Sequence, residues 1–158
     1  MRVATWQTTS VSVSRVIDAP AKDIYEFLTL PRNHVALDGS DMVRGAVNGD
    51  QRLSQVGEVF TMDMYAESQG GDYQRENHVS GLVENKIVAW KPAKPGEQPG
   101  GWEYVYTLEP QGSQATEVTV TYDWSEVTDA KLKARFPIIA KQDLETSLGH
   151  IASAVSEK

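Results

Sequence analysis

Aromatic and methionine side chains recur at every second position in several stretches of the sequence. In an extended strand every second side chain points to the same face, so the members of each stretch share a face. The set consists of Phe60, Met62, Met64, Trp90, Trp102, Tyr104, Tyr106, Tyr122 and Trp124. Such residues either pack a solid core or line a cavity for an apolar guest. Because buried tyrosine and tryptophan need partners for their polar groups, we predict that all nine contact a ligand.

Four side chains are candidates for proton transfer, namely Tyr104, Tyr106, His34 and Asp38. His34 and Asp38 are four residues apart, which places them on one face of a helix. The pair suits a general acid and base beside a cavity, two metal ligands, or an ordinary polar pair near a helix end. Because no third ligand is visible, we predict no metal site, and we predict no cofactor because the sequence has no phosphate-binding motif.

Several other polar residues have two interpretations. Arg15 shares a strand face with apolar residues, so it either forms a salt bridge at an exposed strand end or anchors an acidic group of a ligand. Arg75 and Asp63 are similarly ambiguous between a structural role and contact with a ligand. His78 alternates with polar neighbours and is expected on the solvent face, unless a bulge at Gly81 shifts the register towards the cavity.

The composition is that of a globular domain without disulfides. The chain has 158 residues, no cysteine and a formal net charge of −7. We predict one domain over 1–158, with 1–9 as a flexible tail. The acidic excess argues against nucleic acid as a partner. Because the chain lacks both a signal-peptide pattern at its start and an apolar run of about 18 residues, we expect no membrane span and a cytoplasmic location.

The elements that position these side chains follow from the apolar periodicity. Alternation predicts a first strand at 10–18, and two short helices follow at 21–28 and 32–37. Further strands are predicted at 42–47, 58–65, 73–83, 86–91, 102–109 and 115–124. The segment 92–101 is rich in proline and glycine and reads as a loop. This order predicts an α+β fold with a curved antiparallel sheet of about seven strands.

The last stretch, 129–158, has the apolar stripe of a long helix. The stripe comprises Leu132, Phe136, Ala140, Leu144, Leu148, Ile151 and Val155. Pro137 interrupts it, so either a short helical turn precedes the proline or the helix kinks there. We predict that the helix lies across the sheet and leaves a space beneath it. The loop 92–101 and the segment Pro137-Ile138-Ile139 are candidate lids over that space.

Three groups of residues carry a resemblance to a known superfamily. Segment 13–25 contains Asp18-Ala19-Pro20 between a strand and a helix, and Val56-Gly57-Glu58-Val59-Phe60 resembles a strand led by glycine. Segments 102–110, 116–118 and 121–125 resemble a closing hairpin. In this order they resemble the START-like superfamily, also written SRPBCC, which is the helix-grip fold of the polyketide cyclase/dehydrase and lipid-transport group.

The resemblance implies a helix-grip domain and leaves three functions open. The first, which we favour, is binding of a hydrophobic or aromatic small molecule between the sheet and the C-terminal helix. The second is an enzyme of the polyketide cyclase or dehydratase type, and the third is a co-chaperone-like interaction module. The expected partner is a hydrophobic small molecule, and either a monomer or a homodimer is compatible with the sequence.

Overall fold

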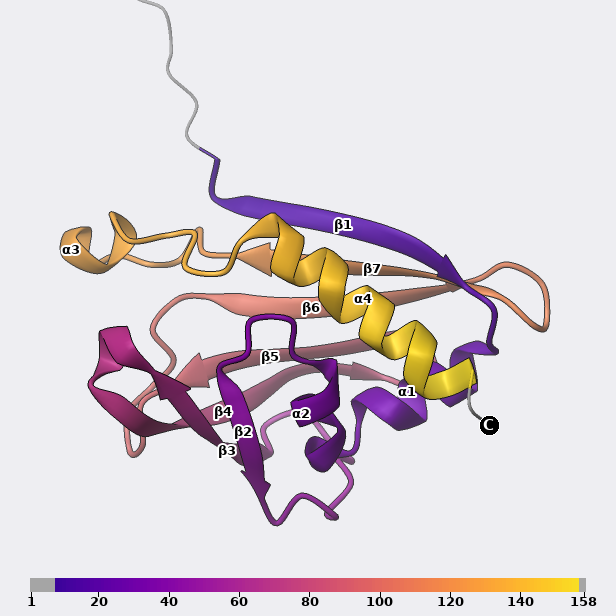
Figure 1. Cartoon of the computed structure of the whole chain (residues 1–158), viewed down its shortest axis with the longest axis horizontal. Coiled ribbons are helices and arrows are strands. Elements are labelled where there is room, and N and C mark those ends of the chain that lie inside the picture. Colours follow the sequence, from indigo (N-terminus) through magenta and orange to yellow (C-terminus); the bar gives the residue numbers. More distant parts are fainter. Residues whose placement is uncertain (1–7, 157–158) are drawn as a thin grey trace, which may run out of the picture.

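The computed structural model describes residues 8–156, so most of the predicted tail at 1–9 lies outside the described residues. One seven-stranded antiparallel sheet forms the body, with strand order β1-β7-β6-β5-β4-β3-β2 (Figure 1). The strands are β1 (Ser10–Ile17), β2 (Val43–Val47), β3 (Val59–Ala66), β4 (Gly71–Val83), β5 (Ile87–Ala93), β6 (Glu103–Pro110) and β7 (Thr116–Asp123). The predicted α+β fold is confirmed, and each predicted strand is present within a few residues of its expected bounds.

Three helices, α1, α2 and α4, gather on one face of the sheet, and α3 lies beyond its end (Figure 1). The helical elements are α1 (Ala21–Leu28), η1 (Pro31–Asn33), α2 (His34–Leu37), η2 (Glu67–Gln69), α3 (Ala130–Lys133) and α4 (Lys141–Ser156). Helix α1 follows Pro20 and buries Ile24, Phe27 and Leu28, the face expected from its periodicity. None of the helices within 8–156 has the length and apolar character needed to cross a membrane.

The closing segment is not one continuous stripe, which corrects the helix expected over 129–158. The carboxylate of Asp129 caps α3 by accepting from the N–H groups of Lys131 and Leu132, and α3 then ends at Lys133. Pro137 has no N–H group and restricts the residue before it, so the helix cannot run through this point. Of the two alternatives at Pro137, the structure has the short helical turn, and α4 begins only at Lys141.

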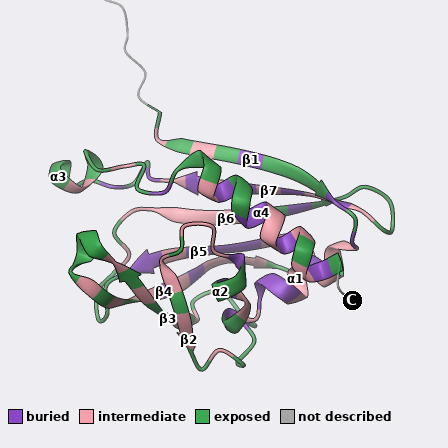
Figure 2. Ribbon diagram, viewed as in Figure 1, coloured by how far each residue is buried: buried purple, intermediate pink, exposed green. Residues whose placement is uncertain are grey.

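Helix α4 buries the second part of the expected stripe against the sheet. Leu144, Leu148, Ile151 and Val155 are each at most 5% exposed. Full burial of one such side chain contributes about 1.5–3 kcal/mol relative to leaving it in water. Figure 2 shows buried segments alternating with less buried ones along α4, in front of strands that also contain buried residues. Packing on the sheet therefore holds α4 in place and positions its other residues above the strands.

A bulge in β4 determines which of its side chains face inward. The pairing with β5 changes register between Val79 and Gly81, where a bulge was predicted. A side chain at Gly81 would place its Cβ 3.1 Å from the Cβ of Ala89, so the close approach favours glycine. Before the bulge, Asn77 and Val79 are buried, and His78 between them points to the opposite face.

Candidate functional site

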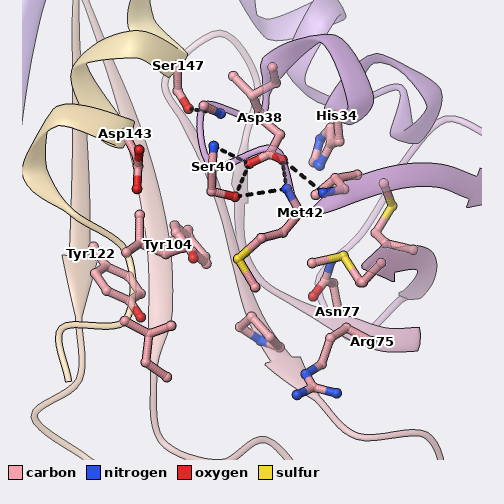
Figure 3. A pocket seen from close by; sticks show the side chains of 18 of the residues that line it. His34, Asp38, Ser40, Met42, Arg75, Asn77, Tyr104, Tyr122, Asp143 and Ser147 are labelled. Atoms are coloured by element: carbon pink, nitrogen blue, oxygen red, sulfur yellow. Dashed lines mark hydrogen bonds between the residues drawn. The ribbon is translucent and has the colours of Figure 1, made fainter. Parts of the chain in front are cut away.

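The space between α4 and the sheet is filled at one end and hollow at the other. The hollow has a volume of about 140 Å³, and we call it the site cavity. Its wall comes from the inner faces of β3 to β7, the loop between α2 and β2, the segment at 138–139 and the first turns of α4 (Figure 3). Elements far apart in the sequence thus enclose a single space.

Seven of the nine predicted ligand contacts line the site cavity. They are Met62, Met64, Trp90, Trp102, Tyr104, Tyr106 and Tyr122. The other two lie behind the wall. Phe60 packs edge-on against Trp90 with ring centroids 6.0 Å apart, and Trp124 stacks on Phe136 at 6.1 Å. The wall is also an aromatic stack, since the rings of Tyr104 and Tyr122 are 4.9 Å apart.

The tyrosine hydroxyl groups point inward and are paired. The Tyr104 hydroxyl interacts with that of Tyr122, and the Tyr106 hydroxyl interacts with Ser147 on α4. Burial raises the pKa of Tyr104 well above its usual range, and it also raises the pKa of Tyr106 and Tyr122. All three phenols are therefore protonated at neutral pH and act as hydrogen-bond donors rather than bases.

His34 lies at the inner end of the site cavity and is 4% exposed. One ring nitrogen, Nε2, is 2.7 Å from the carbonyl oxygen of Leu28, and the ring lies 4.7 Å from that of Trp90. Burial lowers the pKa of His34 to about 4, against a smaller opposite effect of the bond to Leu28. The imidazole is therefore neutral at pH 7 and donates from Nε2 to the carbonyl.

Asp38 does not pair with His34. One carboxylate oxygen, Oδ1, accepts from the backbone N–H and the hydroxyl of Ser40 at 3.0 and 2.6 Å. The other, Oδ2, accepts from the backbone N–H groups of Met42 and Val43, each at 2.9 Å. These four bonds, drawn in part in Figure 3, hold the loop between α2 and β2. Asp38 therefore shapes the wall, and its oxygens are already occupied.

That loop closes against α4 through Gly39. Its N–H donates to Ser147 Oγ at 3.1 Å, and a side chain at Gly39 would run into the backbone carbonyl of Asp143. One turn after Ser147 on α4, Nδ1 of His150 lies 3.3 Å from the carbonyl oxygen of Leu37. Close backbone contact thus seals this side of the site cavity, and only glycine fits there.

Strand β4 adds three polar side chains to the site. The sequence left the role of Arg75 open and did not single out Tyr73 or Asn77. Tyr73, Arg75 and Asn77 line the site cavity at alternate positions. Asn77 is 6% exposed, and its side chain forms no hydrogen bond with another residue of 8–156. The alternation that predicts His78 on the solvent face also places Asn77 inward, but the sequence left open whether the bulge at Gly81 reverses the two.

The other polar candidates lie away from the site cavity. His78 is on the outer face, and its Nε2 is buried without a partner in the described part of the chain. Asp63, also on the outer face, accepts from Gln74 Nε2 at 2.8 Å. Arg15 is exposed beside Gly149 of α4. No cluster of three or more potential metal ligands exists among residues 8–156.

Of the two candidate lids, one forms part of the wall. Ile138 and Ile139 line the site cavity, and their backbone N–H groups approach the Tyr122 hydroxyl and oppose the effect of burial on its pKa. The segment expected as a loop at 92–101 is shorter, because β5 continues to Ala93. Pro92 at the end of β5 still contributes to the wall.

Comparison with known proteins adds relatives of unassigned role. No protein-family model matches the chain. An uncharacterized protein of Mycobacterium tuberculosis, Rv0088, is 32% identical over 114 residues, which are 72% of this chain and 47% of that protein. The chain therefore spans about half the length of the curated relatives it matches.

Solved structures share the architecture over nearly the whole chain. The Aha1 dimer from Colwellia psychrerythraea has a TM-score of 0.59 and 22% identity, and the match covers 94% of this chain and 96% of that one. Truncated norcoclaurine synthase from Thalictrum flavum has a TM-score of 0.66 and 14% identity, and the match covers 100% of this chain and 99% of that one. At these identities the likeness is one of fold, and it confirms the predicted architecture.

Proposed function

We propose that this chain, which has the helix-grip fold of the START-like superfamily, binds a small apolar or aromatic molecule in the site cavity. The observation that carries the proposal is a hollow of about 140 Å³ walled mainly by apolar and aromatic side chains. An apolar protein cavity of about 150 Å³ holds benzene, so a guest of about one ring matches this volume. Burial of its surface contributes about 25 cal/mol per Å² before the costs of association.

The polar groups of the wall support a specific orientation of the guest. Tyr106 and Tyr122 stay protonated at neutral pH, so their hydroxyl groups can donate a hydrogen bond to a guest. A fully packed core has no need for such groups, whereas a binding site uses a few of them to orient a mainly apolar guest. Met62 and Met64 supply adaptable apolar surface opposite them.

The test is thermal denaturation of the protein with a panel of one-ring and two-ring compounds. A ligand at a hundred times its Kd stabilises the folded state by about 2.7 kcal/mol. For a chain of this size we expect the melting temperature to rise by about 5–10 °C. A panel that leaves the melting temperature unchanged at saturating concentrations would contradict the proposal.

A pair of variants locates the binding. Asn77→Phe adds a ring on the inner face of β4 and fills the site cavity, so it should abolish the response. Gln74→Phe adds the same ring on the exposed outer face and should keep it. A response of Asn77→Phe equal to that of the wild type would place the ligand elsewhere.

A cyclase- or dehydratase-type enzyme is the second candidate function. It is favoured by protonated phenols and a neutral imidazole at one hollow, since these groups can donate to a carbonyl oxygen or accept a proton from a guest. The structural neighbour norcoclaurine synthase is an enzyme. Unchanged turnover of an identified substrate by both Tyr104→Phe and Tyr106→Phe would remove these residues as proton carriers. The co-chaperone-like alternative has only the fold shared with Aha1 in its favour.

A further inference from the structure

We propose that the guest of the site cavity is a small aromatic acid, whose carboxylate binds to Arg75 and Asn77. The inference rests on the proposed function, because it names the chemical class of ligand for the same cavity. Arg75 and Asn77 stand two residues apart on the inner face of β4, across the space from Tyr104 and Tyr122 (Figure 3). Two donors on one face of a strand are about 7 Å apart along the chain, a spacing that one carboxylate or its bridging water can span.

The guanidinium of Arg75 has donors to spare. Its Nη1 donates to the carbonyl oxygen of Gln74 at 3.1 Å, and its Cζ lies 4.6 Å from the ring centroid of Tyr73. Arg75 forms no ion pair within 4 Å in the part of the chain that the structure describes; Glu97 acts on it only from a greater distance. An arginine held over a ring is pre-organised to bind a carboxylate with two parallel hydrogen bonds.

Asn77 is the second observation that points to a ligand. Its side chain is buried, lines the site cavity and has no partner among residues 8–156. Its amide atoms are not sealed off, since Nε2 of His78 is the only completely buried side-chain N or O atom without a partner among residues 8–156, so a guest in the site cavity can reach them. The amide NH₂ supplies a neutral donor beside the guanidinium.

The carboxylates on the same wall do not offer a matching site for an amine. All four hydrogen bonds to Asp38 come from its own loop. Of the two Asp143 oxygens, Oδ2 accepts from the N–H of Ala140, and the carboxylate lies in the first turn of α4 at the positive end of the helix dipole. Arg75 and Asn77 keep N–H donors without partners among the described residues, and a guest rich in acceptors complements them.

The inference is tested with three probes of nearly equal shape: phenylacetate, phenylacetamide and phenethylamine. Titration calorimetry on the full chain measures the Kd of each. Charge-assisted hydrogen bonds are about twice as strong as neutral ones, so we expect phenylacetate to bind about tenfold tighter than the amide, with the amine weakest. The preference should weaken as salt is added.

Variants assign the preference to the two residues. Arg75→Gln should bring the Kd of phenylacetate to within about twofold of the Kd of phenylacetamide, and Asn77→Leu should weaken phenylacetate binding about tenfold. Arg44→Gln is the matched control, because Arg44 also lies over a tyrosine, Tyr65 at 5.3 Å, but outside the site cavity. Circular dichroism of each variant checks that it is folded.

The outcomes separate the two proposals. Equal binding of the three probes, a preference for the amine, or a carboxylate preference that survives in Arg75→Gln would overturn the anionic-ligand inference and leave the proposed function standing. Failure of all three probes and of the whole compound panel would overturn both.

Discussion

The two ends of the space beneath α4 are built from different kinds of side chain. At the filled end, Ile24, Leu28, Val118 and Ile151 are completely buried and aliphatic. At the hollow end the inward positions of the strands are tyrosine, tryptophan, methionine, arginine and asparagine. The change happens within single strands: inward residues of β7 pass from Val118 and Val120 to Tyr122. Branched aliphatic side chains fill space without needing partners, whereas the polar-tipped ones need something to bind.

The ends also differ in how their buried polar groups are satisfied. Thr116 at the filled end is fully buried and donates to the carbonyl oxygen of Ala19 at 2.8 Å. Asn77 at the hollow end is almost as buried and has no such bond among the described residues. The filled end is therefore optimised for stability, and the hollow end keeps groups that stability alone does not favour.

The largest expected effect compares two leucines one turn apart on α4. Both are buried, but only Leu144 lines the site cavity. We expect Leu148→Ala to lower the free energy of unfolding by about 4 kcal/mol and Leu144→Ala by about 2 kcal/mol. Urea denaturation measures both. Equal losses would mean that the two ends are packed alike.

Acid titration tests the inner end of the hollow. The pKa of His34 is lowered to about 4 in the folded state, so between pH 4 and 6.5 the unfolded chain binds a proton that the folded chain does not. Stability should therefore fall as the pH drops through this window, by about 3 kcal/mol in total.

The variant His34→Gln isolates this contribution, since its amide can still donate to the carbonyl of Leu28. We expect the difference in unfolding free energy between wild type and variant to change by about 3 kcal/mol from pH 8 to pH 4. A difference that is independent of pH would show that His34 is accessible to protons in the folded state.

The two buried polar residues should respond to apolar replacement with opposite signs. Thr116→Val loses a satisfied hydrogen bond and should destabilise the protein by about 1 kcal/mol. Asn77→Leu removes an unpartnered amide and should stabilise the protein by about 1 kcal/mol in the absence of ligand. Chemical denaturation at one pH measures both changes. Destabilisation by both variants would contradict the proposed difference between the filled end and the hollow end.

The smallest expected effect compares two arginines. Arg52 donates to the carbonyl oxygen of Glu26 at 2.6 Å and to Thr29 Oγ1 at 2.7 Å, beside α1. Arg52→Gln should cost about 1 kcal/mol. Arg75→Gln at the hollow should change stability by less than about 0.5 kcal/mol, because Arg75 makes one backbone contact and no ion pair in the described chain. A larger loss at Arg75 would make it structural.

The sequence predicts the frame of the molecule well, because local periodicity determines it. The alternation in β1 and the helical spacing of Ile24, Phe27 and Leu28 each specify an element and its buried face. The stripe over 129–158 misled at its start because Leu132 and Phe136 have helical spacing by chance, while Pro137 separates them from α4. Long-range packing, not spacing, places Phe136 against Trp124.

The site could be predicted only in part. Seven of the aromatic and methionine positions line the hollow because they occupy inward strand positions, which periodicity reveals. Asn77 was missed because its direction depends on the bulge between Val79 and Gly81. The use of Asp38 to hold a loop depends on backbone N–H groups, which every residue except proline carries and which leave no mark in a sequence.

The most direct test of the central claim is the NMR spectrum of protein labelled with ¹³C at the methionine methyl groups. Met42, Met62 and Met64 all line the site cavity. Addition of a one-ring ligand that raises the melting temperature should shift the methyl signals of all three, and Asn77→Phe should suppress the shifts. If the ligand saturates the protein while these three signals stay in place, the hollow beneath α4 is not the binding site.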